Sequence, residues 1–148
     1  MFNRILIVCV GNICRSPMAE GMLKNWLASN NATVEVSSAG VAAVVDKPAT
    51  RLAQTLLQTH NIDISSHVAR QINENMVRRA DLILAMENTQ KKRIETLYPF
   101  SLGKVFLLGK WENFEVPDPY GGIQPDYEEA FDLINKGLIS WQKKICPQ

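Results

Sequence analysis

The sequence predicts an α/β fold in which one domain, residues 1–148, contains a parallel sheet with helices on both faces. Short aliphatic segments alternate with amphipathic helical segments along the chain, which is typical of such sheets. The first predicted strand, residues 4–10, is apolar without interruption from Ile5 to Val10, as expected of a strand buried on both faces. A composition that is 46% hydrophobic over 148 residues is sufficient for one packed core.

The expected elements follow one another in a β-α-β-α order. Strands are predicted over residues 4–10, 34–38, 81–86 and 104–108. Ser16 suits a helix N-cap and Pro17 the first helical position, so a helix is expected directly after the first loop. Further helices are predicted around residues 52–57, over 88–98 before Pro99, and from Tyr127, where apolar residues keep helical spacing for about five turns.

Composition restricts the classes of function. Lys and Arg total 16 against 15 for Asp and Glu, so no excess of charge indicates a nucleic-acid or membrane partner. The first aliphatic run is too short to span a bilayer and lacks a small-residue cleavage site. The cysteines, Cys9, Cys14 and Cys146, suit neither a disulfide framework nor a zinc site. We therefore expect a cytoplasmic monomer with free thiols that requires no metal and no cofactor.

The loop after the first strand has the pattern of a phosphate-binding site. Its sequence is Cys-x5-Arg-Ser, and it begins at Cys9, where the first predicted strand ends. In parallel sheets, ligands bind at the carboxyl ends of the strands. A loop that curls into a helix N-terminus directs backbone N–H groups at an anion, and Gly11 and Asn12 favour this because both residue types tolerate positive φ. The predicted phosphate-binding residues are Val10, Gly11, Asn12, Ile13, Cys14, Arg15 and Ser16.

Within this loop, three side chains carry predicted chemical roles. Arg15 presents a planar fork that can hold two phosphate oxygens, whereas a lysine would offer only a point charge. The positive surroundings favour the thiolate form of Cys9, which is then a nucleophile for phosphorus. Ser16 can hydrogen-bond the sulfur and stabilise it as a leaving group. The competing interpretation is that Cys9 and Cys14 are only small buried residues near a strand end.

A proton donor is expected on the long loop after the fourth strand. Expelling a phenolate is helped by a general acid, and Asp118 lies between Pro117 and Pro119, which stiffen the backbone there. The loop follows a strand whose carboxyl end is on the same side as Cys9, so Asp118 can face the pocket. Tyr120 is a candidate for the aromatic wall around a substrate ring.

These motifs, together with residues 19–20, 37–40 and 66–71, closely resemble the low-molecular-weight protein tyrosine phosphatase family over essentially the whole chain. The resemblance implies a four-stranded parallel sheet, with Cys9 as nucleophile, Arg15 as clamp, and Asp118 as general acid and then base. It also implies a hydrogen-bonded brace of the phosphate loop formed by Asn12, Ser38 and His67. Relatives with a cysteine at the position of Cys14 form a reversible disulfide with the nucleophile.

Two departures make the chain similar to the bacterial branch of that family. Gly121 replaces a second tyrosine that animal members carry, and residues 41–45 are aliphatic where animal members place aromatic residues beside the pocket. Val41 and Tyr120 are therefore the predicted substrate-pocket residues. The resemblance implies a phosphotyrosine protein as substrate, with a tyrosine autokinase of capsule or exopolysaccharide export as partner.

Three other functions remain open on the sequence. Thioredoxin-linked arsenate reduction uses a similar loop but needs further cysteines, and no cysteine lies between Cys14 and Cys146. A phosphocysteine carrier module of a sugar phosphotransferase system would store the phosphoryl group, against which Arg15 and Asp118 argue. An inactive phosphotyrosine-binding module would keep the loop without an acid.

Overall fold

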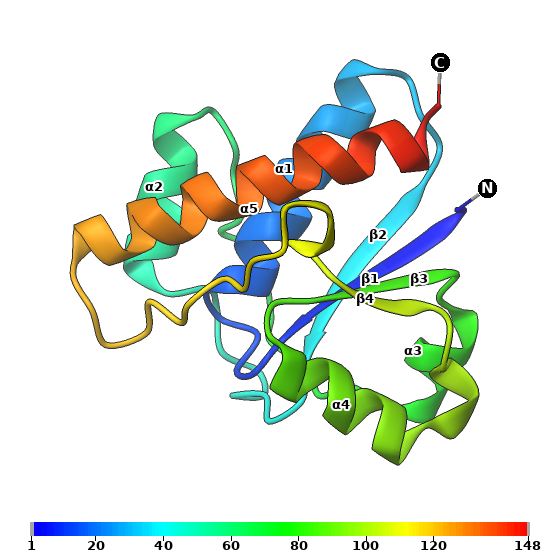
Figure 1. Cartoon of the computed structure of the whole chain (residues 1–148). Helices are drawn as coiled ribbons and strands as arrows, with labels where there is room; N and C mark the ends of the chain where they lie inside the picture. The colour runs from blue at the N-terminus through cyan, green and yellow to red at the C-terminus, as the bar shows by residue number, and fades with distance from the viewer. Residues whose placement is uncertain (1, 148) are drawn as a thin grey trace.

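The computed structural model describes residues 2–147 and has a four-stranded parallel sheet at its centre (Figure 1). The strands are β1 (Arg4–Cys9), β2 (Glu35–Gly40), β3 (Leu82–Ala85) and β4 (Val105–Leu107), in the spatial order β2-β1-β3-β4. Because β1 lies inside the sheet and all strands run parallel, the loops that follow them meet at one edge. The predicted α/β class with four parallel strands is confirmed.

Helices cover both faces of this sheet, also as predicted. The helices α1 (Arg15–Ser29), α2 (Arg51–Thr59) and α5 (Gln124–Ile145) share one hydrophobic core with one face of the strands. The helices α3 (Glu74–Arg79) and α4 (Asn88–Leu97) form a second core on the other face. Two 3₁₀ turns, η1 (Pro99–Ser101) and η2 (Lys110–Glu112), flank β4. No helix within residues 2–147 is long and apolar enough to cross a membrane.

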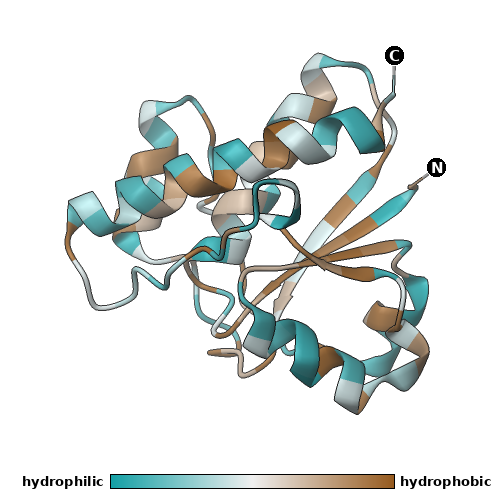
Figure 2. Ribbon diagram, in the orientation of Figure 1, coloured by the Kyte–Doolittle hydropathy of each residue, from teal (hydrophilic) through white to brown (hydrophobic). Residues whose placement is uncertain are grey.

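Strand β1 explains why the first aliphatic run is uninterrupted. Ile5 and Ile7 pack into the core under α1 and α5, whereas Leu6 and Val8 pack under α3 and α4. All four are at most 2% exposed, and each buried side chain of this size contributes roughly 1.5–3 kcal/mol. The apolar strands inside the helical layers are visible in Figure 2. The strand that carries the first loop is therefore held rigidly from both sides.

Three local expectations were wrong. Ser16 does not cap α1, which begins at Arg15 with Cys14 as N-cap, because the Ser16 hydroxyl turns inward to the Cys9 sulfur. Helix α5 begins at Gln124, three residues before Tyr127, and the Asp126 carboxylate accepts the N–H of Ile123 there. The six-residue helix α3 has no counterpart in the prediction; its N-cap Asn73 accepts from the N–H of Met76.

Candidate active site

The phosphate loop connects the end of β1 directly to the start of α1. Asn12 has φ 60°, so the backbone turns at this residue through the left-handed region that asparagine tolerates. The expectation that Gly11 also needs positive φ was wrong, because its φ is outside that region and an added Cβ would meet only the side chains of Ile13 and Val44 at 3.5 Å. One asparagine therefore makes the turn.

The sulfur of Cys9 is surrounded by hydrogen-bond donors. The backbone N–H of Asn12 donates to Cys9 Sγ at 3.3 Å, and Ser16 Oγ lies 2.9 Å from the same sulfur. Asn12 Nδ2 donates to Ser16 Oγ at 2.7 Å, which leaves the hydroxyl proton of Ser16 free to point at Cys9. These donors, with the positive end of the α1 dipole, stabilise negative charge on the sulfur.

The guanidinium of Arg15 is hydrogen-bonded at Nη1, whereas its Nε–Nη2 edge makes no hydrogen bond among residues 2–147. Its side chain is 1% exposed, and Nη1 donates to Glu87 Oε1 at 2.6 Å and to the carbonyl of Val116 at 2.7 Å. Nη2 lies 3.6 Å from Asp118 Oδ2, and Nε is buried without a hydrogen-bond partner among residues 2–147. The Nε–Nη2 edge is therefore available to hold two oxygens of one anion.

The side chain and carbonyl of Asn12 are held by three residues, Ser38, His67 and Arg70. Asn12 Nδ2 donates to Ser38 Oγ at 3.0 Å, and Asn12 Oδ1 accepts from the N–H of Arg70 at 2.9 Å. His67 Nε2 lies 2.7 Å from the carbonyl oxygen of Asn12; because a carbonyl only accepts, Nε2 carries the proton. The left-handed turn of the loop is thus tied to β2 and to the segment before α3.

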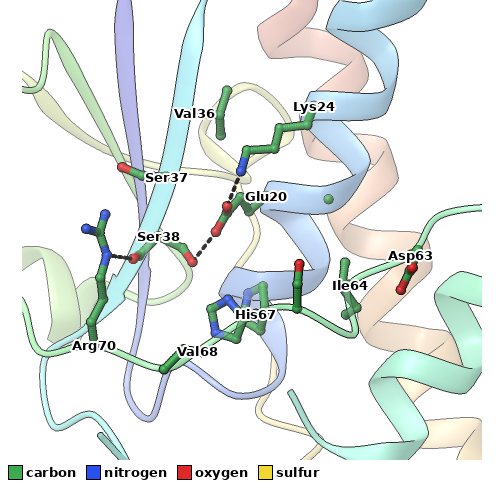
Figure 3. Close-up of a pocket in the computed structure, with 13 residues that line it drawn as sticks. Glu20, Lys24, Val36, Ser37, Ser38, Asp63, Ile64, His67, Val68 and Arg70 are labelled. Atoms are coloured by element: carbon green, nitrogen blue, oxygen red, sulfur yellow. Dashed lines mark hydrogen bonds and ion pairs between the residues drawn. The ribbon is translucent and has the colours of Figure 1, made fainter. Parts of the chain in front are cut away.

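A chain of polar residues extends this brace toward α1. Ser38 Oγ donates to the carboxylate of Glu20, which also pairs with Lys24 one turn later (Figure 3). Arg70 Nε donates to the carbonyl of Ser38 at 2.9 Å. The hydroxyl that holds Asn12 is therefore itself oriented by an acceptor behind it.

Asp118 reaches the same pocket as Cys9 and Arg15. The pocket has a volume of about 200 Å³ and contains these three residues with Tyr120 and the apolar residues Val10, Ile13, Ala42 and Val44. Asp118 Oδ1 accepts from the N–H of Tyr120 at 3.1 Å, while Oδ2 faces Arg15. Half of the Asp118 side chain and two thirds of Tyr120 are exposed, so both border the pocket entrance.

Val41, a predicted substrate-pocket residue, is absent from the lining of the pocket that holds Cys9 but lines the neighbouring cleft along α4. Its side chain is 6% exposed and belongs to the core on the α3 and α4 side of the sheet. Ala42 and Val44, from the same loop, line the pocket beside Cys9 instead. The choice between neighbouring loop residues depends on the backbone direction after β2, which the aliphatic sequence does not specify.

Comparison with known proteins agrees with this geometry. The family model described as low molecular weight phosphotyrosine protein phosphatase matches residues 4–148. The chain belongs to this family. The match confirms the predicted enzyme class, a protein-tyrosine-phosphatase of low molecular weight.

Similar members of the phosphatase family come from bacteria. The probable low molecular weight protein-tyrosine-phosphatase EpsP of Ralstonia nicotianae is 43% identical over 98% of this chain and 97% of its own. The solved Wzb of Vibrio vulnificus in complex with benzylphosphonate has a TM-score of 0.91 and 34% identity over 97% and 99% of the two chains. A mutant of the YwlE arginine phosphatase with a phosphorylated active-site serine has a TM-score of 0.89 and 34% identity over 95% of each chain.

Within this family fold, Cys14 is among the residues that line the phosphate pocket, and its buried thiol also contacts side chains outside the loop. Its Sγ lies 3.4 Å from the hydroxyl of Tyr127 on α5 and 3.6 Å from Thr50 Oγ1. Burial raises the pKa of the Cys14 thiol above its ordinary value, and burial likewise raises the pKa of Tyr127 to about 12. Both groups are therefore protonated at neutral pH. Cys146 lies at the far end of α5 and is a free thiol, as are Cys9 and Cys14.

Sequence reasoning missed three residues that contact the site residues: Glu87, Glu20 and Tyr127. Glu87 directly follows the end of β3, so the rule that functional groups gather at strand ends was a usable signal. Glu20 lies in α1 and Tyr127 in α5, where nothing in the local pattern assigns either residue a contact with the site.

Proposed function

We propose that the chain hydrolyses phosphotyrosine through a phosphocysteine intermediate on Cys9, with Arg15 as phosphate clamp and Asp118 as general acid and base. The observation that carries this proposal is the free Nε–Nη2 edge of Arg15 in the pocket that also holds Cys9 and Asp118. A buried guanidinium whose Nε–Nη2 edge makes no hydrogen bond within the protein has two parallel donors for an oxyanion.

In the first step, the Cys9 thiolate attacks phosphorus in line with the ester oxygen. An S–P bond forms as the P–O bond to the tyrosine breaks, and Asp118 gives its proton to the departing phenolate. Arg15 and the backbone N–H groups of the loop hold the three equatorial oxygens, whose charge they stabilise during transfer. Tyrosine leaves neutral, and the phosphoryl group remains on Cys9.

In the second step, water replaces the tyrosine. Asp118, now a carboxylate, takes a proton from the water as its oxygen attacks phosphorus and the S–P bond breaks. The electron pair returns to Cys9 as a thiolate, which the hydroxyl of Ser16 at 2.9 Å and the N–H of Asn12 stabilise. Inorganic phosphate leaves, and the enzyme is restored without a metal ion.

The pocket lining favours an aryl phosphate over the second candidate, phosphoarginine, which the YwlE arginine phosphatase makes relevant. Val10, Ile13, Ala42 and Val44 offer apolar surface to a flat ring, and Tyr120 stands at the entrance. A guanidinium would need several acceptors, and Asp118 is the one carboxylate that lines this pocket. The benzylphosphonate bound by the Vibrio vulnificus Wzb is likewise a ring joined to a phosphorus oxyanion.

The decisive experiment measures steady-state hydrolysis of p-nitrophenyl phosphate, a phosphotyrosine peptide and a phosphoarginine peptide by wild type, Cys9→Ser and Asp118→Asn. Cys9→Ser should show no turnover on any substrate, and EDTA should not change the wild-type rate. Asp118→Asn should lose about 10²-fold or more on phosphotyrosine but less on p-nitrophenyl phosphate, whose leaving group needs little protonation.

Three results would reject parts of this mechanism. Appreciable turnover by Cys9→Ser excludes the phosphocysteine. Equal losses of Asp118→Asn on both aryl substrates remove Asp118 from the acid role. A higher kcat/KM on phosphoarginine than on phosphotyrosine assigns the enzyme to the second candidate function.

We further propose that the chain is cytoplasmic and that its physiological substrate is a tyrosine autokinase of capsule or exopolysaccharide export. The likeness to the bacterial branch of the family supports the partner, and the free thiols Cys9 and Cys14 suit a reducing compartment. A purified phosphorylated autokinase should lose its phosphotyrosine to wild type, as detected by phosphotyrosine antibody, and retain it with Cys9→Ser. Retention with both proteins would argue against this partner.

A further inference from the structure

A second cleft of about 610 Å³ opens beside the active-site pocket and follows helix α4. Val10 and Ala42 line both cavities, so the cleft is continuous with the pocket that holds Cys9. Glu87, the N-cap of α4, contacts Arg15 at 2.6 Å, so α4 begins at the site and runs away from it (Figure 1). A polypeptide whose phosphorylated side chain enters the pocket would pass along this cleft, called here the α4 groove.

The charged residues of the α4 groove are all basic. Lys92 and Arg93 line it, both are exposed, and neither forms an ion pair within residues 2–147. Their neighbour Lys91, in contrast, pairs with Glu95 at 2.9 Å. No carboxylate lines the groove, and the whole chain carries a net charge of only +1. The positive charge is therefore a local property of this face.

The groove also exposes apolar surface. Val10 is 38% exposed and Leu97 is 52% exposed, at opposite ends of the groove. Apolar side chains that stay exposed beside unpaired charges are typical of a surface that another polypeptide covers. The combination of cations with an apolar strip fits an acidic segment that also carries hydrophobic residues.

We propose that the α4 groove binds the residues flanking the phosphotyrosine and selects segments with acidic residues within about four positions of it. The lining of α4 spans Thr89 to Leu97, which is about 12 Å at 1.5 Å per helical residue. An extended peptide covers this length with about four residues at about 3.3 Å each. The inference rests on the proposed phosphatase function and adds the class of sequence that the site prefers.

The test compares kcat/KM for three phosphotyrosine peptides of equal length: one with Asp and Glu before the phosphotyrosine, one with them after it, and one with Asn and Gln throughout. Wild type should prefer one acidic peptide over the neutral peptide by about three- to tenfold, as expected of two exposed ion pairs. In Lys92→Gln/Arg93→Gln this ratio should fall to about one, and in Lys92→Glu/Arg93→Glu below one. High salt should reduce the wild-type ratio.

The matched control is Lys143→Gln/Lys144→Gln, which removes two adjacent exposed cations from the last turn of α5. It has the same change in net charge and should keep the wild-type ratio. Because the readout is a ratio between peptides, partial unfolding of a variant lowers both values alike and does not imitate the effect.

The outcomes separate this inference from the proposed function. If wild type hydrolyses no phosphotyrosine substrate, the proposed function fails. If it hydrolyses all three peptides with equal kcat/KM, or if the control variant loses the preference as strongly as the Lys92 and Arg93 variants, the groove assignment is overturned. Sedimentation of wild type as a dimer that Lys92→Glu/Arg93→Glu dissociates would assign the groove to a second copy and also overturn it.

Discussion

At the scale of single residues, the site depends on how the donors of Arg15 are divided. Arg15 Nη1 donates hydrogen bonds to Glu87 and to the carbonyl of Val116, which fixes the plane of the guanidinium. Nε and Nη2 make no hydrogen bond within residues 2–147 and are the donors proposed to hold the substrate. An arginine can do both because its five donors point in fixed, separate directions. A lysine ammonium hydrogen-bonded to Glu87 would have no second pair of parallel N–H donors for the phosphate oxygens.

Arg15→Lys should therefore lose about 10²- to 10³-fold in kcat/KM toward p-nitrophenyl phosphate, the cost of removing a preorganised charge-stabilising donor. Steady-state kinetics measures the loss, and circular dichroism checks that the variant is folded. Arg78→Lys, on the exposed surface of α3, is the matched control and should keep wild-type activity. An Arg15→Lys enzyme within tenfold of wild type would show that the paired donation is dispensable.

Cys14 carries a second prediction at this scale, because it lies in the same loop as Cys9. We propose that peroxide oxidises the Cys9 thiolate to a sulfenic acid, whose sulfur the Cys14 thiolate attacks; the S–S bond forms as the S–O bond breaks, and the departing hydroxide takes a proton from solvent to become water. Since burial raises the pKa of Cys14, its thiolate fraction is small at neutral pH. The rate of disulfide closure should therefore increase about tenfold per pH unit above neutrality, until the thiol titrates.

Mass spectrometry of the peptide that contains both cysteines should show the loss of two hydrogens after mild peroxide, with activity restored by dithiothreitol. Cys14→Ala should be inactivated irreversibly under the same conditions. Free Cys14 beside an overoxidised Cys9 in wild type would exclude this protective disulfide.

At the scale of elements, the phosphate loop is shaped by the end of β2 as much as by its own sequence. Gly40 pairs with Cys9 in the register of the two strands. A Cβ at Gly40 would lie 2.4 Å from the carbonyl oxygen of Val10 and 3.1 Å from the N–H nitrogen of Asn12. Both are backbone atoms, so the loop itself would have to move.

Gly40→Ala should consequently destabilise the protein by about 1–3 kcal/mol, the usual cost of overpacking, and lower kcat/KM because the donors of the loop are displaced. Urea denaturation measures the stability change. Gly11→Ala is the matched control for stability, since its Cβ would meet only side chains at 3.5 Å. Equal stabilities of the two variants would show that the close approach at Gly40 relaxes without cost.

At the scale of the whole molecule, the loops after four strands and the start of α1 converge around the pocket proposed to bind phosphate. The phosphate loop follows β1, the Ala42 and Val44 segment follows β2, Glu87 follows β3, and Asp118 follows β4. An oxyanion bound there links elements that are distant in sequence and binds the folded chain alone. Its binding energy therefore adds to the stability of the fold.

Vanadate or phosphate at about 100 times its Kd should stabilise the enzyme by about 2.7 kcal/mol. For a chain of this size, that energy raises the Tm by about 5–10 °C. Differential scanning calorimetry with chloride at equal ionic strength as reference measures the shift. In Arg15→Lys, most of this anion-induced rise in Tm should be lost. An equal shift in that variant would place the stabilising anion outside the proposed site.

The sequence by itself determined the fold class and the main residues of the site. The strands and helices follow from the period of apolar residues. Cys9 ends β1, Arg15 begins the helix after it, and Asp118 lies in the loop after β4; a parallel sheet brings these connections to one edge. The helix α3 escaped prediction because a six-residue helix carries too short an apolar pattern. Ser16 was misassigned as a cap because its hydroxyl had a better partner that is seven residues away in sequence.

Only the tertiary structure decided which neighbours complete the site. Glu87 orients Arg15, Glu20 orients Ser38, and Tyr127 holds Cys14, across separations of 72, 18 and 113 residues. The local pattern of apolar residues predicts which face of a helix or strand is buried. It does not predict which distant side chain contacts that face. For the same reason the sequence did not predict the α4 groove, whose lining combines Val10 of the loop after β1 with Arg93 of α4.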